Sequence, residues 1–373
     1  MRYLPARDGP AGLPPAMTSA PDSRKEDADA TIRRPRPREL SEMLPRPAPA
    51  LPPFRIGLTP PDLSRWRAGN TGIEGVHTFR AEQPGPHVVI SALMHGNEFA
   101  GAIVLDELLS SGFRPVCGTL SVVFLNLAAF DSFDPGRPAL SRFLDEDMNR
   151  LWGFSSEELH GSRERERVRS LLPLIGSADM VLDLHSMLWP GAPALLCSAG
   201  AEGPDEGPDQ ERGQALARRI GAPRLIVTDQ RHRDGLRLID MPRFTAAGGR
   251  AAACLLEAGE HWMPETVADT RATVARFLAI TGMTHQGHIR HRRRPLHAKV
   301  ERSVAARTAA LRFTRNWRNG DIVPERGTVI ARDGGEDIRT PWDHCMLILP
   351  NLRPAQGHTA VRFGRIRQGT AEG

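Results

Sequence analysis

The stretch VVISALMHGNEFAGAIVLDELLS, residues 88–110, decides how this chain of 373 residues folds. Its first part, residues 88–93, is apolar except for Ser91, which is typical of a buried strand. Residues 99–110 carry apolar side chains at helical spacing and predict a helix. A polar turn at residues 94–98 lies between them, so the stretch predicts a strand, a turn and a helix in direct succession.

The same alternation continues along the chain. Further strands are predicted at 120–127, 180–185 and 252–257, and a helix at 164–174. Arg and Glu alternate in that helix, and we expect them to cover a solvated face. Strands that alternate with helices indicate an α/β domain with a largely parallel or mixed sheet.

The two ends of the chain have a different composition. Residues 1–52 are rich in Pro, Arg, Asp and Ala, and such a segment cannot bury enough apolar surface to offset its ordering entropy, so we expect a disordered tail. The α/β domain then spans 53–295. After the basic run 288–297, short β-like pieces separated by Gly, Pro and Asp turns predict a small all-β domain at 296–373.

Composition excludes several classes of protein. The net charge of +5 comes from 49 basic and 44 acidic residues, a modest excess that does not by itself imply nucleic-acid binding. The four cysteines stand singly, which argues against a cysteine zinc site or a disulfide framework. No secretory signal pattern and no run near the roughly 18 apolar residues of a membrane helix is present. We therefore expect a soluble, cytoplasmic protein with no membrane partner.

The turn after the first strand contains a candidate metal-binding pair, His95 and Glu98. In open α/β sheets, functional sites gather at the carboxyl ends of strands. His and Glu three residues apart on a tight turn can face the same ion, and Gly96 permits the bend. In a chain with 13 histidines this pattern is weak alone, and its position at a strand-to-helix junction is what makes it a candidate.

A second candidate ligand, His185, ends the predicted strand 180–185. This strand end is expected at the same edge of the sheet as the turn that carries Glu98. Two histidines, one carboxylate and a water form the catalytic type of zinc site. Asp183 is a candidate to orient a ligand from behind. The alternatives are a structural histidine that caps the strand and a satisfied surface carboxylate.

Two further clusters contain polar side chains that could take part in catalysis or substrate binding. Glu257 ends another apolar run and is a candidate base for a metal-activated water, or alternatively an ion-paired strand end with His261. Residues 141–150, SRFLDEDMNR, contain Arg142 and Asn149. Guanidinium groups bind carboxylates bidentately and asparagine adds a donor, although a charged loop is the alternative.

These four clusters, in this order, resemble the succinylglutamate desuccinylase/aspartoacylase family, a branch of the zinc carboxypeptidase superfamily. The matching stretches are HGNE at 95–98, RF at 142–143, DMNR at 147–150, DLH at 183–185 and EAG at 257–259. The likeness spans about residues 85–262, and a small β domain after residue 296 also fits the family plan. The resemblance implies a zinc-carboxypeptidase-like mixed sheet flanked by helices.

The resemblance also implies a role for each cluster. It assigns three ligands to one Zn²⁺ per chain, and these are His95, Glu98 and His185. Glu257 would be the general acid/base, and Arg142 would polarise the scissile carbonyl and stabilise its oxyanion. Asn149 and Arg150 would grip the substrate carboxylate. The implied reaction is hydrolysis of the amide of a small N-acyl amino acid, and a homo-oligomer stays open.

The chain departs from the family pattern at three places. Asn126 is followed by Leu127 where the family has proline, Arg142 is followed by Phe143 where it has tyrosine, and Tyr3 is the one tyrosine of the whole chain. These departures leave the zinc chemistry intact and the substrate open. A metallocarboxypeptidase acting on peptides is the alternative enzyme. A binder of nucleic acid or of an acidic partner through the run 288–297, and a non-catalytic relative, are the alternatives from other classes.

Overall fold

The computed structural model describes residues 49–200, 211–230, 234–285 and 294–367. All of them belong to one compact unit, residues 48–373. The predicted tail 1–52 lies outside the described residues except for its last four positions. Residues 288–293, most of the basic run, also lie outside the described part of the chain.

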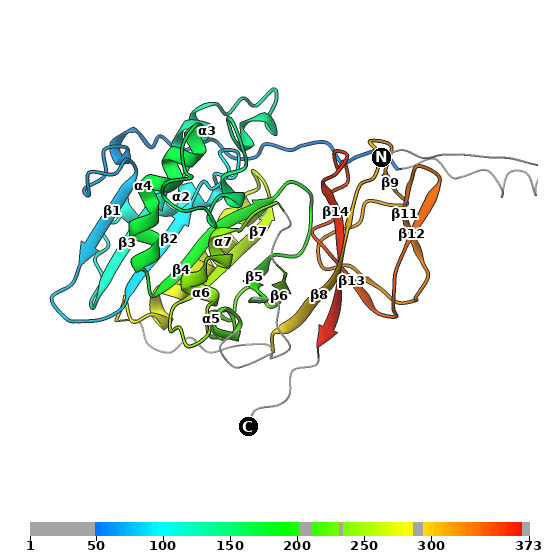
Figure 1. Cartoon of the computed structure of the whole chain (residues 1–373). Helices are drawn as coiled ribbons and strands as arrows, with labels where there is room; N and C mark the ends of the chain where they lie inside the picture. Colours follow the sequence, from blue (N-terminus) through cyan, green and yellow to red (C-terminus); the bar gives the residue numbers. More distant parts are fainter. Residues whose placement is uncertain (1–48, 201–210, 231–233, 286–293, 368–373) are drawn as a thin grey trace, which may run out of the picture. The chain divides into compact units, whose positions relative to one another are not determined.

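A mixed sheet is the centre of the fold (Figure 1). In the described residues it has eleven strands, in the order β1 (Val76–Arg80), β3 (Thr119–Phe124), β2 (His87–Ala92), β4 (Met180–Met187), β7 (Ala252–Glu260), β5 (Ala194–Ser198), β6 (Leu225–Asp229), β8 (Leu296–Ala305), β14 (Thr359–Arg367), β13 (Cys345–Ile348) and β10 (Ile322–Val323). Strands β3, β2, β4 and β7 run parallel, so their carboxyl ends lie at one edge. The predicted mixed α/β fold is confirmed.

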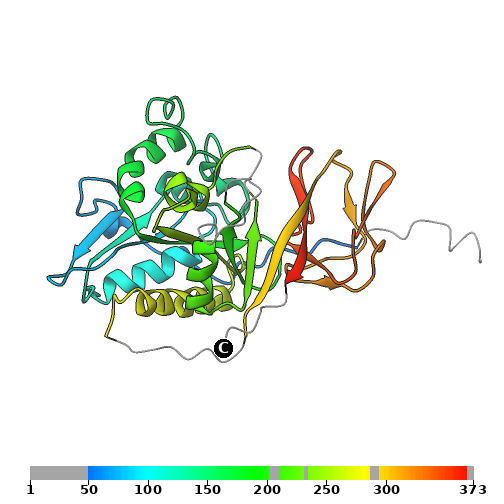
Figure 2. The same cartoon turned by 60° about the horizontal axis from the view of Figure 1, so that its bottom comes forward.

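Helices cover both faces of this sheet because successive side chains of a buried strand point to opposite sides. In β2, Val88 and Ile90 pack into one apolar cluster and Val89 into another. The first cluster includes α2 (Ala100–Ser110), α5 (Arg212–Ile220) and α7 (Pro264–Ile280), and the second includes α4 (Arg163–Ser177) and α6 (Pro242–Thr245). Figure 2 shows α2 and α7 side by side on one face, with α4 on the other.

Several predicted element ends differ from the structure, and β4 continues past His185 to Met187 while β7 continues past Glu257 to Glu260. The strand predicted at 120–127 is β3, which ends at Phe124 because Asn126 caps the short helix α3 (Leu127–Asp131) and accepts a hydrogen bond from Ala129 N at 3.2 Å. Helix α4 extends beyond the predicted 164–174 at both ends, since Ser162 caps its start. Polar caps thus set the end of β3 and the start of α4 against the apolar pattern.

The expectation that the Arg and Glu side chains of α4 lie on a solvated face holds for Arg163, Glu166 and Arg169 but is wrong for Glu164. Glu164 is buried, with an exposed fraction of 1%. Arg167 donates to the carbonyl oxygens of Leu125 at 2.6 Å and Phe124 at 2.8 Å, and burial lowers its pKa to about 10. Arg167 therefore connects α4 to the end of β3, and Glu164 binds Asn126, which follows that strand.

The C-terminal β region begins with β8, which pairs in parallel with β6 and so continues the large sheet. Strands β8, β14, β13 and β10 then pair antiparallel, beside a three-stranded sheet of β12 (Glu336–Arg339), β11 (Val329–Asp333) and β9 (Arg312–Phe313). This region has its own apolar cluster, which includes Phe313, Trp317 and Phe363. A domain boundary at 295/296 stays a prediction. Within the described ranges, the helices are too short or too polar to cross a bilayer.

Candidate metal centre

The parallel strands bring the candidate ligands to one edge of the sheet. Ala92, the last residue of β2, pairs with Leu184 of β4, and His185 pairs with Glu257 of β7. His95 and Glu98 lie on the turn directly after β2. Three segments that are far apart in sequence therefore meet because their strands are neighbours in register.

His95, Glu98 and His185 form a compact buried group whose potential ligand atoms all lie within 4.8 Å of one another. The two imidazoles are arranged alike. His95 Nδ1 lies 2.7 Å from Glu98 Oε1, and His185 Nδ1 lies 2.9 Å from Glu98 Oε2. Both Nδ1 atoms thus face the same carboxylate, and this shared space is where a cation would be held.

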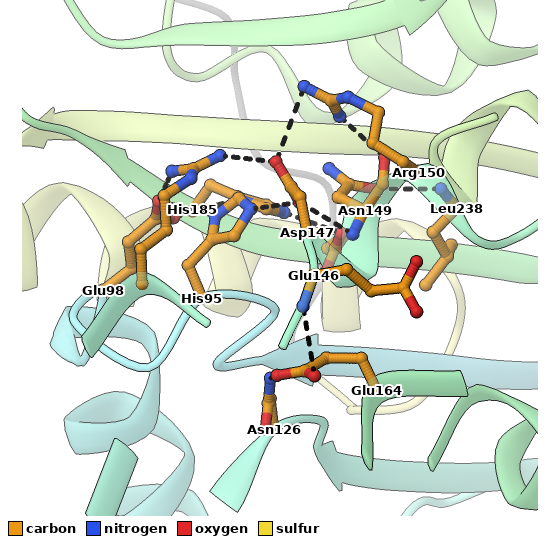
Figure 3. Close-up of polar contacts among 12 residues, drawn as sticks. His95, Glu98, Asn126, Glu146, Asp147, Asn149, Arg150, Glu164, His185 and Leu238 are labelled. Carbon is orange, nitrogen blue, oxygen red and sulfur yellow. Dashed lines mark hydrogen bonds and ion pairs between the residues drawn. The ribbon is translucent and has the colours of Figure 1, made fainter. Parts of the chain in front are cut away.

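The opposite nitrogen of each imidazole is bound by an aspartate, and Figure 3 shows the one beside His95, which is Asp147. His95 Nε2 lies 3.1 Å from Asp147 Oδ1, and His185 Nε2 lies 2.8 Å from Asp183 Oδ2. A carboxylate that accepts from Nε2–H leaves the Nδ1 lone pair available, which is the usual arrangement behind a metal-ligating histidine. The donor set and its anchoring therefore fit a divalent metal ion.

The electrostatics of this group show why a cation suits it. Burial alone would raise the pKa of Glu98, but the charges of His95 and His185 and their hydrogen bonds hold that pKa well below its usual value. Burial likewise opposes the charged form of His185, while Asp183 and Glu98 raise its pKa well above the usual value. Positive charge must accompany these buried carboxylates, whether on the imidazoles or on an ion.

The turn that carries His95 and Glu98 is held by close backbone packing. A Cβ on Gly96 would lie 2.3 Å from the carbonyl carbon of Ala129, so only glycine fits. Gly96 N donates to Arg142 O at 3.1 Å, and Leu93 has a positive φ of 64° as the chain leaves β2. The backbone therefore fixes the direction of both ligand side chains.

The loop that carries Arg142 is anchored by Glu164, whose role the sequence did not reveal. Its carboxylate accepts backbone N–H groups from Leu144 at 2.8 Å and Asp145 at 3.1 Å, and it also accepts from Asn126 Nδ2 at 3.1 Å. Arg142 then extends Nη1 to 3.2 Å from Glu98 Oε1. Nothing in the Arg/Glu alternation of α4 signals this function.

Asp147, the first residue of the DMNR stretch, connects the group of His95, Glu98 and His185 to Arg142 and Arg150. It receives Arg142 Nη2 at 3.2 Å, and Arg150 Nη2 lies 3.7 Å from its Oδ2. Asn149 is buried, and its Oδ1 accepts from Leu238 N at 3.1 Å. The amide orientation of Asn149 is thereby set, with its NH₂ group left to donate elsewhere.

Glu257 differs from the other carboxylates because its Oε2 is buried and has no hydrogen-bond partner. Burial and the charge of Glu98 raise its pKa to about 8, against the opposing charges of His185 and Arg142. The ion pair with His261 is not formed, because His261 Nδ1 lies 2.6 Å from Ser186 Oγ instead. An unsatisfied buried carboxyl next to a metal group is a feature of a reactive site.

The structure brings five of the residues singled out in the sequence into one network of contacts. His95, Glu98 and His185 are in mutual contact, and Arg142 touches Glu98. Arg150 is connected to them through Asp147.

Comparisons with known proteins show which chains this one is similar to. Residues 84–281 match the family model of the succinylglutamate desuccinylase/aspartoacylase catalytic domain. A succinylglutamate desuccinylase of Burkholderia pseudomallei is 34% identical over 323 residues, covering 80% of this chain and 85% of that protein. One of Serratia proteamaculans is 28% identical over 288 residues, covering 72% and 81%.

The fold is also similar to that of solved structures. The crystal structure of a succinylglutamate desuccinylase from Vibrio parahaemolyticus superposes with a TM-score of 0.60 at 17% identity, covering 79% of this chain and 87% of that one. At this identity the likeness concerns the fold.

Gly96→Ala tests whether the turn is held as tightly as the contacts imply. The new methyl group meets backbone rather than a flexible side chain, so we expect a loss of about 1–3 kcal/mol in the free energy of unfolding, and weaker metal binding. Gly176→Ala is the matched control, because nothing lies within 4 Å of its Cβ position in α4, and it should be neutral or stabilising. Chemical denaturation of both variants decides; equal stabilities would contradict the close approach.

The raised pKa of Glu257 predicts a pH-dependent stability in the metal-free protein. The unfolded chain ionises this group near 4.5 and the folded chain near 8, so its contribution to stability is complete below pH 4.5 and is lost as the pH rises toward 8. Denaturation of the wild type and of Glu257→Gln across this range isolates the group. The stability difference should shift against the wild type with rising pH; a constant difference would show that the carboxyl is not perturbed.

Proposed function

Because the chain belongs to the succinylglutamate desuccinylase/aspartoacylase family, we propose that it is a zinc-dependent hydrolase that cleaves the amide of a small N-acyl amino acid. The observation that carries the proposal is the buried group of His95, Glu98 and His185 beside the unpartnered carboxyl of Glu257. A ligand set and a base side by side are what metal-assisted hydrolysis requires.

The donor types support zinc as the metal. Two imidazole nitrogens and one carboxylate oxygen form a three-ligand catalytic site that leaves a position open, whereas Mg²⁺ and Ca²⁺ prefer sets made of oxygen alone. When bound by His95, Glu98 and His185, zinc supplies Lewis acidity toward the scissile carbonyl and the attacking water.

Glu257 is proposed as the general acid/base. It removes a proton from the attacking water and returns that proton to the nitrogen of the leaving amine. Its buried position, which raises its pKa to about 8 in the protein without metal, brings the group toward the range in which one carboxyl can both accept and donate. A cation close by lowers this pKa again and favours the basic form before the attack.

Arg142 is proposed to stabilise the oxyanion that develops on the scissile carbonyl. Its guanidinium is held by Glu98 and Asp147, and 38% of its side chain is exposed, so it is oriented by protein groups and still open to a ligand. Five N–H donors allow it to keep these contacts and bind a further oxygen.

Asn149 and Arg150 are proposed to grip a carboxylate of the substrate. The NH₂ group of Asn149 is left to donate because its Oδ1 is used by Leu238 N. Arg150 donates Nη1 to the Asn149 carbonyl at 2.7 Å, which fixes the two residues relative to each other and leaves further guanidinium donors.

His185→Ala tests the metal site. Removing one of three ligands should reduce bound zinc from about one equivalent per chain to a small fraction, measured by elemental analysis after dialysis against a weak chelator. His160→Ala, an exposed histidine, is the matched control and should keep the metal. Full zinc content in His185→Ala would remove this residue from the ligand set.

Glu257→Gln tests the base while leaving the ligands in place. It should retain zinc and lower kcat by about 10²–10⁴-fold, the usual contribution of general acid/base catalysis. Glu260→Gln, at the end of the same strand, should keep kcat near the wild-type value. Turnover of N-acetyl, N-succinyl and N-formyl amino acids and of short peptides, followed by amine release, provides the assay; peptide cleavage without deacylation would favour a metallocarboxypeptidase.

A further inference from the structure

Trp262, in the segment that follows β7, contacts the turn of residues 94–98, which carries two of the candidate ligands. Its indole Nε1 donates to the backbone carbonyl oxygen of Asn97 at 2.9 Å, and Asn97 stands between His95 and Glu98. Both partners of this hydrogen bond are buried, with exposed fractions of 2% and 3%. Away from water a hydrogen bond is stronger, and removal of the donor leaves a buried carbonyl without it.

The backbone of Trp262 has a conformation that bulky residues rarely adopt. Its φ is 62°, in the left-handed region that favours glycine. A conformation of this kind persists only where the surrounding contacts hold it, and such residues cluster at functional sites. Glycine would relieve the backbone at this position, but it would remove the indole. The conformation therefore points to a role for the side chain itself.

Contacts from separate segments hold Trp262 in this conformation. His261 N donates to the carbonyl oxygen of Met187, the last residue of β4, at 2.7 Å, and Gly57 N donates to the carbonyl oxygen of Trp262 at 2.9 Å. The ring of Phe54 meets the indole edge-on, with ring centroids 5.8 Å apart. Because Phe54 and Gly57 belong to the segment that precedes β1, the first part of the described chain helps to fix the indole.

The preceding residue, His261, contacts the segment that carries the third candidate ligand. His261 Nδ1 lies 2.6 Å from Ser186 Oγ, and Ser186 directly follows His185 in β4. Two successive residues after β7 thus contact both ligand-bearing segments. Since β7 also carries Glu257, these contacts connect the strand of the candidate base to the turn and to the end of β4.

We propose that Trp262 is a positioning residue whose hydrogen bond to the Asn97 carbonyl oxygen holds the turn of His95 and Glu98 in its metal-binding conformation before an ion binds. This role rests on the proposed function, in which the turn binds zinc. Without the indole donor the turn can adopt further conformations, and only a fraction of the molecules has both ligands in place. The apparent zinc affinity falls by that fraction, because binding must also order the turn.

Zinc affinity of the full-length protein, measured by competition with a chromophoric chelator, tests this role. Trp262→Phe keeps an aromatic ring and removes the N–H donor. It should bind zinc about 10- to 100-fold more weakly than the wild type, the usual effect of losing a group that orients ligands from behind. Trp317→Phe is the matched control, because Trp317 is also buried and its Nε1 donates to the carbonyl oxygen of Ile330 at 3.1 Å, in the C-terminal β region. This variant should bind zinc like the wild type.

Hydrogen exchange in the metal-free protein gives a second readout that needs neither zinc nor turnover. The amides of Gly96 and Glu98 donate to carbonyl oxygens in the folded turn, and they should exchange about 5-fold faster or more in Trp262→Phe than in the wild type and in Trp317→Phe. Thermal unfolding shows whether each variant folds. If Trp262→Phe does not fold, Phe54→Leu loosens the indole from a residue that is 41% exposed, and it should cause smaller changes in the same direction.

Unchanged exchange rates in Trp262→Phe, or an unchanged zinc affinity where the wild type binds zinc, would overturn the positioning role and leave the proposed hydrolase function standing. If the wild type binds no zinc, the proposed function fails, and the exchange rates alone decide whether Trp262 holds the turn. If the wild type hydrolyses N-acyl amino acids, Trp262→Phe should lose turnover at limiting zinc and regain it with excess zinc. A variant whose fold is damaged would not regain it, and that result would also count against the role.

Discussion

The site depends on the burial of one carboxylate, that of Glu98. A buried carboxylate is stable only when donors or positive charges surround it, and Glu98 obtains them from both imidazoles, from Arg142 and from the backbone N–H of Ser186. These partners come from the turn after β2, from β4 and from the loop at 142. The need to compensate Glu98 therefore draws separate segments to one point, which is also the point at which a metal ion would add its charge.

The parallel strands make this convergence possible. Because β2, β4 and β7 are parallel and adjacent, residues near their carboxyl ends are neighbours, and short side chains are enough to bring them into contact. The helices on both faces bury the strands and leave this edge to loops. Gly96 and Leu93 then let the chain turn so sharply that His95 and Glu98 face the end of β4.

The candidate ligands and the candidate base can be predicted from sequence because each lies directly beside a recognisable apolar run or turn. His95 and Glu98 share one turn, His185 ends an apolar run, and Glu257 ends another. The supporting residues have no such signal. Glu164 looks like one of many charges on a helix, yet it is buried and holds the backbone of residues 144 and 145. Its function exists only once α4 packs beside that loop, and tertiary contacts of this kind leave no period in the sequence.

The residues that local sequence signals predict all lie within the part of the chain that the family model matches, residues 84–281. The family model ends at residue 281 and contains the metal group, Glu257 and the loop of Arg142. Arg362 lies beyond it, on β14, and shares the carboxylate of Asp229 with Arg237. Chemistry shared by a family must be encoded where the reacting atoms lie, and the candidate ligands and Glu257 all fall inside the matched region. The region matched by the family model thus contains the groups of the proposed reaction, and the C-terminal β region is attached to the same sheet through β8 and the ion pair of Arg362 with Asp229.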